Sequence, residues 1–156
     1  MAVDRLAERK REGERTGQYV DAAGVKTWFD SWGSGSPLLL LHGDLVGNGP
    51  WEPMVPALAE RFRVLAPERR GHGHTPDVEG DLTYWLLAED TIAFLETVAE
   101  GPAHLVGWSG GGNVALIVAS QRPDLVRNGV SVTHSTNKPV VGGTSGGNFA
   151  VARYRA

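Results

Sequence analysis

The sequence predicts an α/β fold in which a mostly parallel sheet carries helices on both faces. Two segments, residues 37–43 (PLLLLHG) and residues 103–108 (AHLVGW), are nearly continuous apolar runs of strand length. Such runs are typical of strands that are buried on both faces of a parallel sheet. Segments with a helical spacing of apolar residues separate the strand-like runs, and this alternation is typical of a sheet with crossover helices.

Each expected element follows from its own pattern. Residues 25–32 alternate apolar and polar side chains after an Ala-Ala-Gly turn, which indicates an opening hairpin. Met54, Leu58 and Phe62 recur at four-residue steps, as on one face of a helix. The predicted strands cover residues 18–21, 25–32, 37–43, 63–67, 103–108 and 125–132. The predicted helices cover residues 51–62, 81–100 and 113–122.

Composition divides the chain into three parts. Residues 1–17 are dominated by Arg, Lys and Glu and predict a charged N-terminal leader. Residues 18–132 carry the α/β pattern and predict a partial domain. No Asp or Glu follows Asp124, and residues 133–156 are rich in Gly, Ser and Thr without periodicity. We therefore expect residues 133–156 to form an irregular tail of doubtful order.

Composition also argues against several classes of function. The formal net charge is only -3, which gives no case for a nucleic-acid partner. Cysteine is absent, which excludes disulfides and thiolate metal sites and leads us to expect a cytoplasmic location. No apolar stretch approaches the roughly 18 residues that span a bilayer, so we expect no membrane partner. His72 and His74 lack the spacing and companion ligands of a metal site, and no cofactor is expected.

A serine between glycines carries the strongest chemical signal. Residues 107–111 (GWSGG) match the nucleophile-elbow pattern G-x-S-x-G, with an apolar run before them and a helical segment after them. Ser109 at the apex must adopt a strained backbone, and glycines on either side leave room for the turn. A purely structural turn and a phosphate-binding loop are the alternatives, although GK[ST] and GxGxxG are missing. Trp108 beside the serine is a candidate for the lining of a pocket.

Residues 38–44 (LLLLHGD) predict the second half of the same site. The chain turns sharply after this strand, at a point where the backbone N–H of Asp44 can face the serine. Together with the N–H of Gly110 it would form an oxyanion hole, in which each donor stabilises the transition state by about 3 kcal/mol. We expect His42 to brace this loop by hydrogen bonding and not to act as the catalytic base.

Three motifs in this order resemble the N-terminal two thirds of α/β-hydrolase fold enzymes. They are HGD after an apolar strand, VLAPERRGHGHTP after the next strand, and LVGWSGGGNVALIVASQRPDLV. They are most similar to bacterial serine hydrolases, a group that includes esterases, lipases, peptidases, carbon–carbon bond hydrolases and cofactor-free peroxidases. The resemblance implies Ser109 as nucleophile, oxyanion N–H groups from Asp44 and Gly110, and a structural turn at residues 69–73. Serine at this position argues against the dehalogenase and epoxide-hydrolase branches, whose nucleophile is a carboxylate.

The groups that would activate the serine are not found where the resemblance places them. In this family an acid and then a histidine follow the serine along the chain. After Ser109 the sequence holds one acid, Asp124, and one histidine, His134. We expect Asp124 to be a turn or surface residue, and His134 is a surrogate candidate for the base. The resemblance therefore predicts a C-terminally truncated domain, which would be a fragment, a frame-shifted product or a natural short form.

The sequence thus predicts a serine hydrolase-type domain that is weakly active or inactive as written. Its substrate would be a small molecule with an ester, amide or similar acyl bond, cleaved through an acyl-enzyme on Ser109. The alternative is a non-catalytic remnant that binds a small apolar ligand or a partner chain, and a third account is an enzyme completed by a second polypeptide that supplies the histidine. Because no strand is expected after residue 132, the open edge of the sheet predicts edge-strand self-association.

Overall fold

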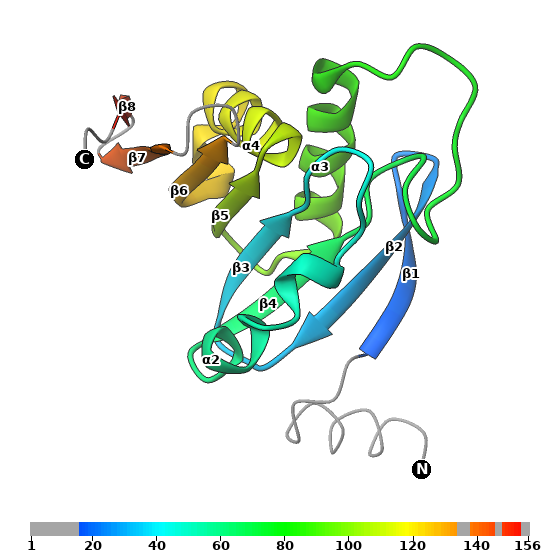
Figure 1. The fold of residues 1–156 in the computed structure, drawn as a ribbon, viewed down its shortest axis with the longest axis horizontal. Coiled ribbons are helices and arrows are strands. Elements are labelled where there is room, and N and C mark those ends of the chain that lie inside the picture. Colours follow the sequence, from blue (N-terminus) through cyan, green and yellow to red (C-terminus); the bar gives the residue numbers. More distant parts are fainter. Residues whose placement is uncertain (1–15, 134–137, 146–147, 154–156) are drawn as a thin grey trace.

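The computed structural model describes residues 16–133, 138–145 and 148–153, which build an eight-stranded sheet in the order β1-β2-β4-β3-β5-β6-β7-β8 (Figure 1). The strands are β1 (Thr16–Ala22), β2 (Val25–Trp32), β3 (Ser36–Leu41), β4 (Phe62–Pro67), β5 (Ala103–Trp108), β6 (Val126–Thr133), β7 (Lys138–Ser145) and β8 (Asn148–Arg153). The α-helices are α2 (Val55–Ala59), α3 (Tyr84–Val98) and α4 (Gly110–Gln121), and the short 3-10 helices are η1 (Gly49–Trp51) and η2 (Pro123–Leu125).

The centre of the sheet is parallel, as predicted. Strand β3 pairs in parallel with β4 on one side and with β5 on the other, and β5 pairs in parallel with β6. Antiparallel strands flank this centre, with β2 beside β4 and β7 beside β6. After β3 the chain continues to β4 on one side of it, whereas after β5 it continues to β6 on the opposite side. The direction in which strands are added to the sheet therefore reverses between the neighbouring strands β3 and β5. In open α/β sheets the crevice at the carboxyl ends of two such strands is where ligands bind.

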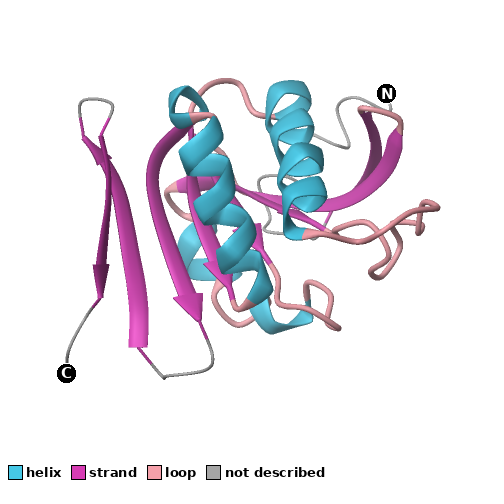
Figure 2. Ribbon diagram, turned by 90° about the horizontal axis from the view of Figure 1, so that it is seen from above, coloured by secondary structure: helices cyan, strands magenta, loops and turns pink. Residues whose placement is uncertain are grey.

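Helices cover both faces of the sheet, which confirms the predicted fold class. Helices α3 and α4 lie side by side on one face, and α2 lies on the other (Figure 2). Because side chains alternate along a strand, Leu39 and Leu41 pack toward α3 and α4, whereas Leu38 and Leu40 pack toward Trp51 and α2. All four leucines of β3 are buried, so this strand has the two-sided burial that its apolar sequence indicated.

Three helix boundaries differ from the predicted ones. The helix expected over residues 51–62 is only the short η1 and α2, because prolines occupy early positions of both and the chain enters β4 at Phe62. Helix α3 begins at Tyr84, where the Thr83 hydroxyl caps it by accepting the N–H of Leu86 at 3.1 Å. Helix α4 begins at Gly110, directly after Ser109, and not at residue 113.

The C-terminal segment also differs from the expected irregular tail. Residues 138–145 and 148–153 form β7 and β8, which pair with each other from Val140↔Arg153 to Ser145↔Asn148. Valine occurs in both runs, threonine in the first and phenylalanine in the second, and a Gly-Gly pair stands between the two runs in the sequence, which is a hairpin pattern and not a helical one. Strand β7 covers the outer edge of β6, so the edge expected to be open is paired.

Parts of the predicted organisation are not tested by the structure. The charged leader, residues 1–17, lies outside the described residues except for Thr16 and Gly17, which begin β1. The boundaries of the leader and of the domain over residues 18–132 stay a prediction. None of the described helices combines the length and the apolar character needed to cross a bilayer.

Candidate active site

The turn from β5 into α4 places Ser109 at the carboxyl end of the parallel sheet. Its backbone has φ 53° and ψ -122°, a left-handed conformation that is strained for a residue with a side chain. The amides of Gly112 and Asn113 donate to the Ser109 carbonyl at 2.8 Å and 3.3 Å, so the helix starts on the serine itself. This is the sharp strand-to-helix turn that the G-x-S-x-G pattern predicts.

The glycines of the motif are required by close backbone packing. A Cβ atom on Gly107 would overlap the backbone of Gly111 and Gly112. A Cβ atom on Gly111 would overlap the carbonyl oxygens of Leu41 and His42, at the end of β3. The serine turn therefore packs directly against the loop that follows β3, which brings the two predicted halves of the site together.

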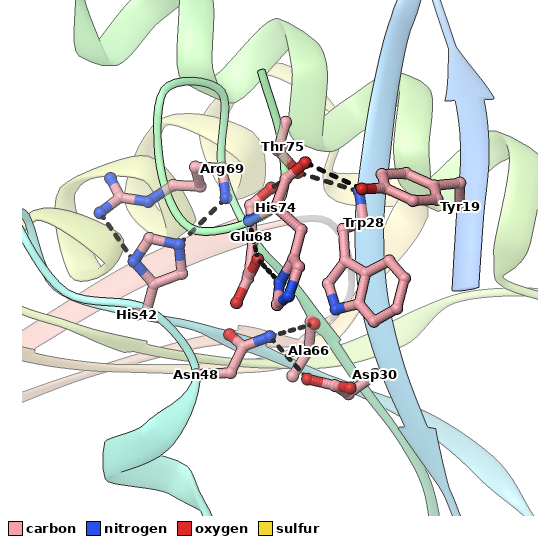
Figure 3. Close-up of polar contacts among 10 residues, drawn as sticks. All are labelled: Tyr19, Trp28, Asp30, His42, Asn48, Ala66, Glu68, Arg69, His74 and Thr75. Atoms are coloured by element: carbon pink, nitrogen blue, oxygen red, sulfur yellow. Dashed lines mark hydrogen bonds and ion pairs between the residues drawn. The ribbon is translucent and has the colours of Figure 1, made fainter. Parts of the chain in front are cut away.

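His42 anchors that loop from within the protein (Figure 3). The side chain is fully buried, and its Nε2 accepts the backbone N–H of Arg69 at 3.0 Å. Nδ1 therefore carries the proton and donates to the Gly43 carbonyl at 2.8 Å. Burial and then the charge of Arg69 lower the pKa of His42 from 6.5 to about 4. His42 is thus a neutral brace, in the architectural role expected for it.

A second histidine holds the tip of the same loop. Leu45 has φ 62° and is 95% exposed, and its N–H donates to Nε2 of His72 at 3.3 Å. The other ring nitrogen of His72 lies 3.0 Å from the Arg70 carbonyl. Among the described residues, three residues other than glycine have a positive φ, and two of them, Leu45 and Ser109, are at this site. Backbone strain is concentrated where function would use it.

The sequence predicted a role only for the backbone N–H of Asp44, whereas in the structure its side chain also lies at the site. Oδ1 accepts from Nη2 of Arg69 at 3.1 Å, and Oδ2 accepts from the Tyr84 hydroxyl at 2.6 Å. A Cβ atom on Gly110 would overlap this carboxylate, so the carboxylate lies against the residue that follows the serine. No local pattern indicates this cluster, because its members come from three segments far apart in the sequence.

A cavity of about 580 Å³ opens beside Asp44. Its lining is mostly apolar and comes from the loop after β3, the start of α3 and the middle of α4; it includes Leu45, Leu82, Trp85, Leu87 and Ile117. Such a cavity has the size of a small-molecule site. Trp108, the predicted lining residue, is not part of it. Alternation along β5 directs Trp108 to the other face, where it packs with the cluster around Trp51.

The turn at residues 69–73 has the structural role that the resemblance implies. Arg70 makes a bidentate pair with Asp90 of α3, at 2.8 Å and 2.7 Å. His74 donates from Nδ1 toward the buried Glu68 at 2.9 Å (Figure 3). His72 and His74 thus face different partners, and the described residues include no cluster of three or more His, Cys, Asp or Glu suited to a metal ion.

Among the residues that the structure describes, none is bonded to Ser109 as a base. Asp124 is exposed and pairs with Arg122, so it is the surface residue that we expected. His134 lies outside the described residues. In the described segments, no histidine makes a hydrogen bond with Ser109; His42, His72 and His74 are bonded elsewhere.

Comparison with known proteins agrees with this architecture. Residues 36–144 match the alpha/beta hydrolase fold family, and the chain belongs to that family. It is 40% identical over 99 residues to a pimeloyl-[acyl-carrier protein] methyl ester esterase of Methylococcus capsulatus, covering 64% of this chain and 37% of the relative. It is 35% identical over 100 residues to a 2-(acetamidomethylene)succinate hydrolase of Mesorhizobium japonicum, covering 64% of this chain and 36% of the relative.

Solved structures show the same likeness. A crystal structure of E-2-(acetamidomethylene)succinate hydrolase superposes with a TM-score of 0.73 at 29% identity, covering 81% of this chain and 47% of that one. The epoxide hydrolase CorEH superposes with a TM-score of 0.71 at 31% identity, covering 74% and 41%. The chain therefore spans less than half the length of these relatives, and the likeness extends to more than one hydrolase chemistry.

Proposed function

We propose that this chain is the nucleophile-bearing part of a serine hydrolase, which cleaves an ester, amide or similar acyl bond through an acyl-enzyme on Ser109. The observation that carries the proposal is the left-handed backbone of Ser109 at the start of α4, packed against the loop after β3. A strained serine at such a turn presents its hydroxyl to a ligand at the carboxyl ends of the strands.

The chemistry follows from the groups around this turn. The Ser109 oxygen would attack the acyl carbon while a base takes its proton, and the negative charge would move to the carbonyl oxygen. We assign the backbone N–H groups of Gly110 and Asp44 to that oxygen, supported by the positive end of the α4 dipole. On collapse of the tetrahedral intermediate the base returns this proton to the leaving group, which departs as an alcohol or amine, and water then hydrolyses the acyl-enzyme. No step needs a cofactor.

We expect residues 1–156 alone to turn over substrate weakly or not at all. No described histidine is bonded to Ser109, and a serine hydroxyl without a base is a poor nucleophile near neutral pH. His134 stays a candidate for a surrogate base. The cytoplasmic location expected from the cysteine-free sequence likewise stays a prediction.

The serine at position 109 restricts the expected substrate class more than the overall similarity to relatives does. The names of the relatives cover a methyl ester esterase, a succinate derivative hydrolase and a soluble epoxide hydrolase. An oxygen nucleophile on serine favours acyl transfer, whereas the epoxide-hydrolase branch uses a carboxylate. We therefore propose a small molecule with an acyl bond as the substrate.

Site-resolved labelling tests the proposal. The 156-residue chain is incubated with excess fluorophosphonate, and the modified peptide is identified by mass spectrometry. We expect slow modification at Ser109 that is lost in Ser109→Ala and retained in Ser120→Ala, which changes an exposed serine on the same helix. Modification elsewhere, or none at Ser109, would overturn the nucleophile assignment. Rapid labelling would contradict the expected weak activity.

A second candidate function is binding of a small apolar ligand without turnover. It is favoured by the apolar lining of the cavity and by the lack of a described base at Ser109. Ligand binding that survives Ser109→Ala, in a chain that fluorophosphonate never labels, would support it. Self-association through a sheet edge also stays a proposal, now for the outer strands β1 and β8.

A further inference from the structure

We propose that Asp44 determines specificity at this site: its carboxylate selects acyl compounds with a positive group close to the reacting carbonyl and rejects those with a negative group there. The proposal deepens the proposed hydrolase function, because it names the charge of the substrate. It depends on where the carboxylate lies, how it is held, and what surrounds it.

The carboxylate borders both the serine turn and the cavity. It occupies the space beside the Cα atom of Gly110, which is the residue after Ser109 and the head of α4. It also lines the cavity of about 580 Å³. A ligand that fills the cavity and reaches Ser109 therefore passes Asp44, and any charge near its carbonyl interacts with this group.

The carboxylate is held in its ionised form. Partial burial opposes ionisation, but the hydrogen bond from the Tyr84 hydroxyl and the charge and hydrogen bond of Arg69 together lower the pKa of Asp44 below its ordinary value. Tyr84 is fixed in turn at the first residue of α3, after the Thr83 cap. The group thus carries a full negative charge in a defined orientation at neutral pH.

The positive partner lies away from the cavity, so the negative end of this ion pair faces the cavity. The Arg69 side chain is 2% exposed and is not among the residues that line the cavity, whereas the Asp44 side chain is 42% exposed. Each carboxylate oxygen accepts one bond from a described side chain, and an ionised carboxylate has about four acceptor sites in all. A ligand ammonium or N–H can therefore bind to an acceptor site that remains.

The other residues that line the cavity are mostly apolar, which favours discrimination between a cationic and an anionic ligand. Asp44 is the one Asp, Glu, Lys or Arg among the described lining residues, and Nε2 of His72 is already occupied by the Leu45 N–H. Leu82, Leu87 and Ile117 offer a ligand carboxylate no compensating donor. The expected ligand is an apolar group with a cation at the end that reaches Asp44.

Binding of two matched probes tests this inference without requiring turnover. Octylammonium and octanoate have the same chain length and opposite charge, and calorimetry at neutral pH and low salt measures their affinities. We expect octylammonium to bind about ten-fold more tightly, because attraction for one probe and repulsion for the other add. The preference should shrink in high salt, since Asp44 is partly exposed. Equal affinities, or tighter octanoate, would overturn the proposal.

Two variants test whether the preference for octylammonium comes from Asp44. Asp44→Asn should bring the two affinities within about three-fold of each other, which is the range left by weak surface electrostatics. Asp81→Asn removes the same charge from an exposed acid beside the cavity-lining Leu82 and should retain the preference. Persistence of the preference in Asp44→Asn would refute the assignment, and the salt dependence of the unmodified protein decides the matter if that variant does not fold. Failure of Ser109 labelling with intact charge preference would refute the hydrolase function alone.

Discussion

At the scale of single residues, the site depends on the distance between two turns. The serine turn contacts the loop after β3 so closely that Gly111 has no room for a methyl group. Asp44 and Leu45 follow this contact along the chain. The Asp44 carboxylate lies against Gly110, and Leu45 has a left-handed backbone. Close approach of two backbones, and not a side-chain contact, thus brings the halves of the site together.

Gly111→Ala tests this close approach. In an ordinary helix the change would stabilise the protein by up to about 1 kcal/mol, because alanine favours helix. Here we expect a loss of about 2 kcal/mol in the free energy of unfolding, since the new Cβ atom overlaps two carbonyl oxygens. Urea denaturation measures the change. Gly49→Ala, where nothing lies within 4 Å of the new atom, is the matched control and should have little effect. A stabilised Gly111→Ala protein would contradict the packing.

At the scale of elements, parallel strands and their crossovers decide which side chains meet. Strand β3 is paired on both sides, and the order of strands reverses between β3 and β5. The loop carrying Asp44 and the turn carrying Ser109 follow these two strands directly. Helix α3 completes the cluster, because its first residue, Tyr84, reaches Asp44. The start of α3 is therefore part of the site.

Thr83→Ala tests the contribution of the α3 cap. Loss of the hydroxyl that accepts the Leu86 N–H should lower the free energy of unfolding by about 1 kcal/mol. Thr97→Ala is the control on the same helix: its hydroxyl bonds to the Ala93 carbonyl, the side chain is exposed, and alanine is the better helix former. Thermal and urea denaturation of both variants should separate them. Equal losses would mean that the Thr83 cap contributes nothing specific.

At the scale of the whole molecule, one buried histidine couples stability to pH. The pKa of His42 is about 4 in the folded protein and near 6.5 when the chain is unfolded. Between these values the unfolded chain binds more protons, so the free energy of unfolding falls as the pH falls from 6.5 toward 4. The contribution of His42 to stability is therefore greatest above pH 6.5, and its loss is about 2 kcal/mol between pH 7 and pH 5.

Comparison with His42→Gln isolates that effect. Glutamine can still hydrogen bond in the loop but does not titrate, so the variant should be less stable at pH 7 and lose less on acidification. Urea denaturation at pH 7 and pH 5 measures both proteins. An identical pH dependence would show that His42 is not the group responsible, because the remaining carboxylates titrate alike in both.

Much of the fold was predictable because its signals are local. The buried strand at residues 103–108 has the bounds expected from its apolar run, and the glycine-flanked serine indicated a turn that the structure shows at φ 53°. Boundaries were less accurate where prolines cut short the first helix. The strands after residue 137 were missed because their Gly, Thr and Val content matches both a loop and a hairpin.

The sequence by itself determined the fold class and the elbow at Ser109, because these depend on apolar patterns and glycines that are local along the chain. The bracing role of His42 was expected from its place after a buried strand, but its partner Arg69 comes from a distant segment. Only the tertiary structure decided the environment of Asp44. Its carboxylate is positioned by Arg69 after β4 and by Tyr84 at the start of α3, and it lies beside Gly110. Contacts between segments so far apart arise from packing, and no local pattern records the sign of charge that packing places beside the serine.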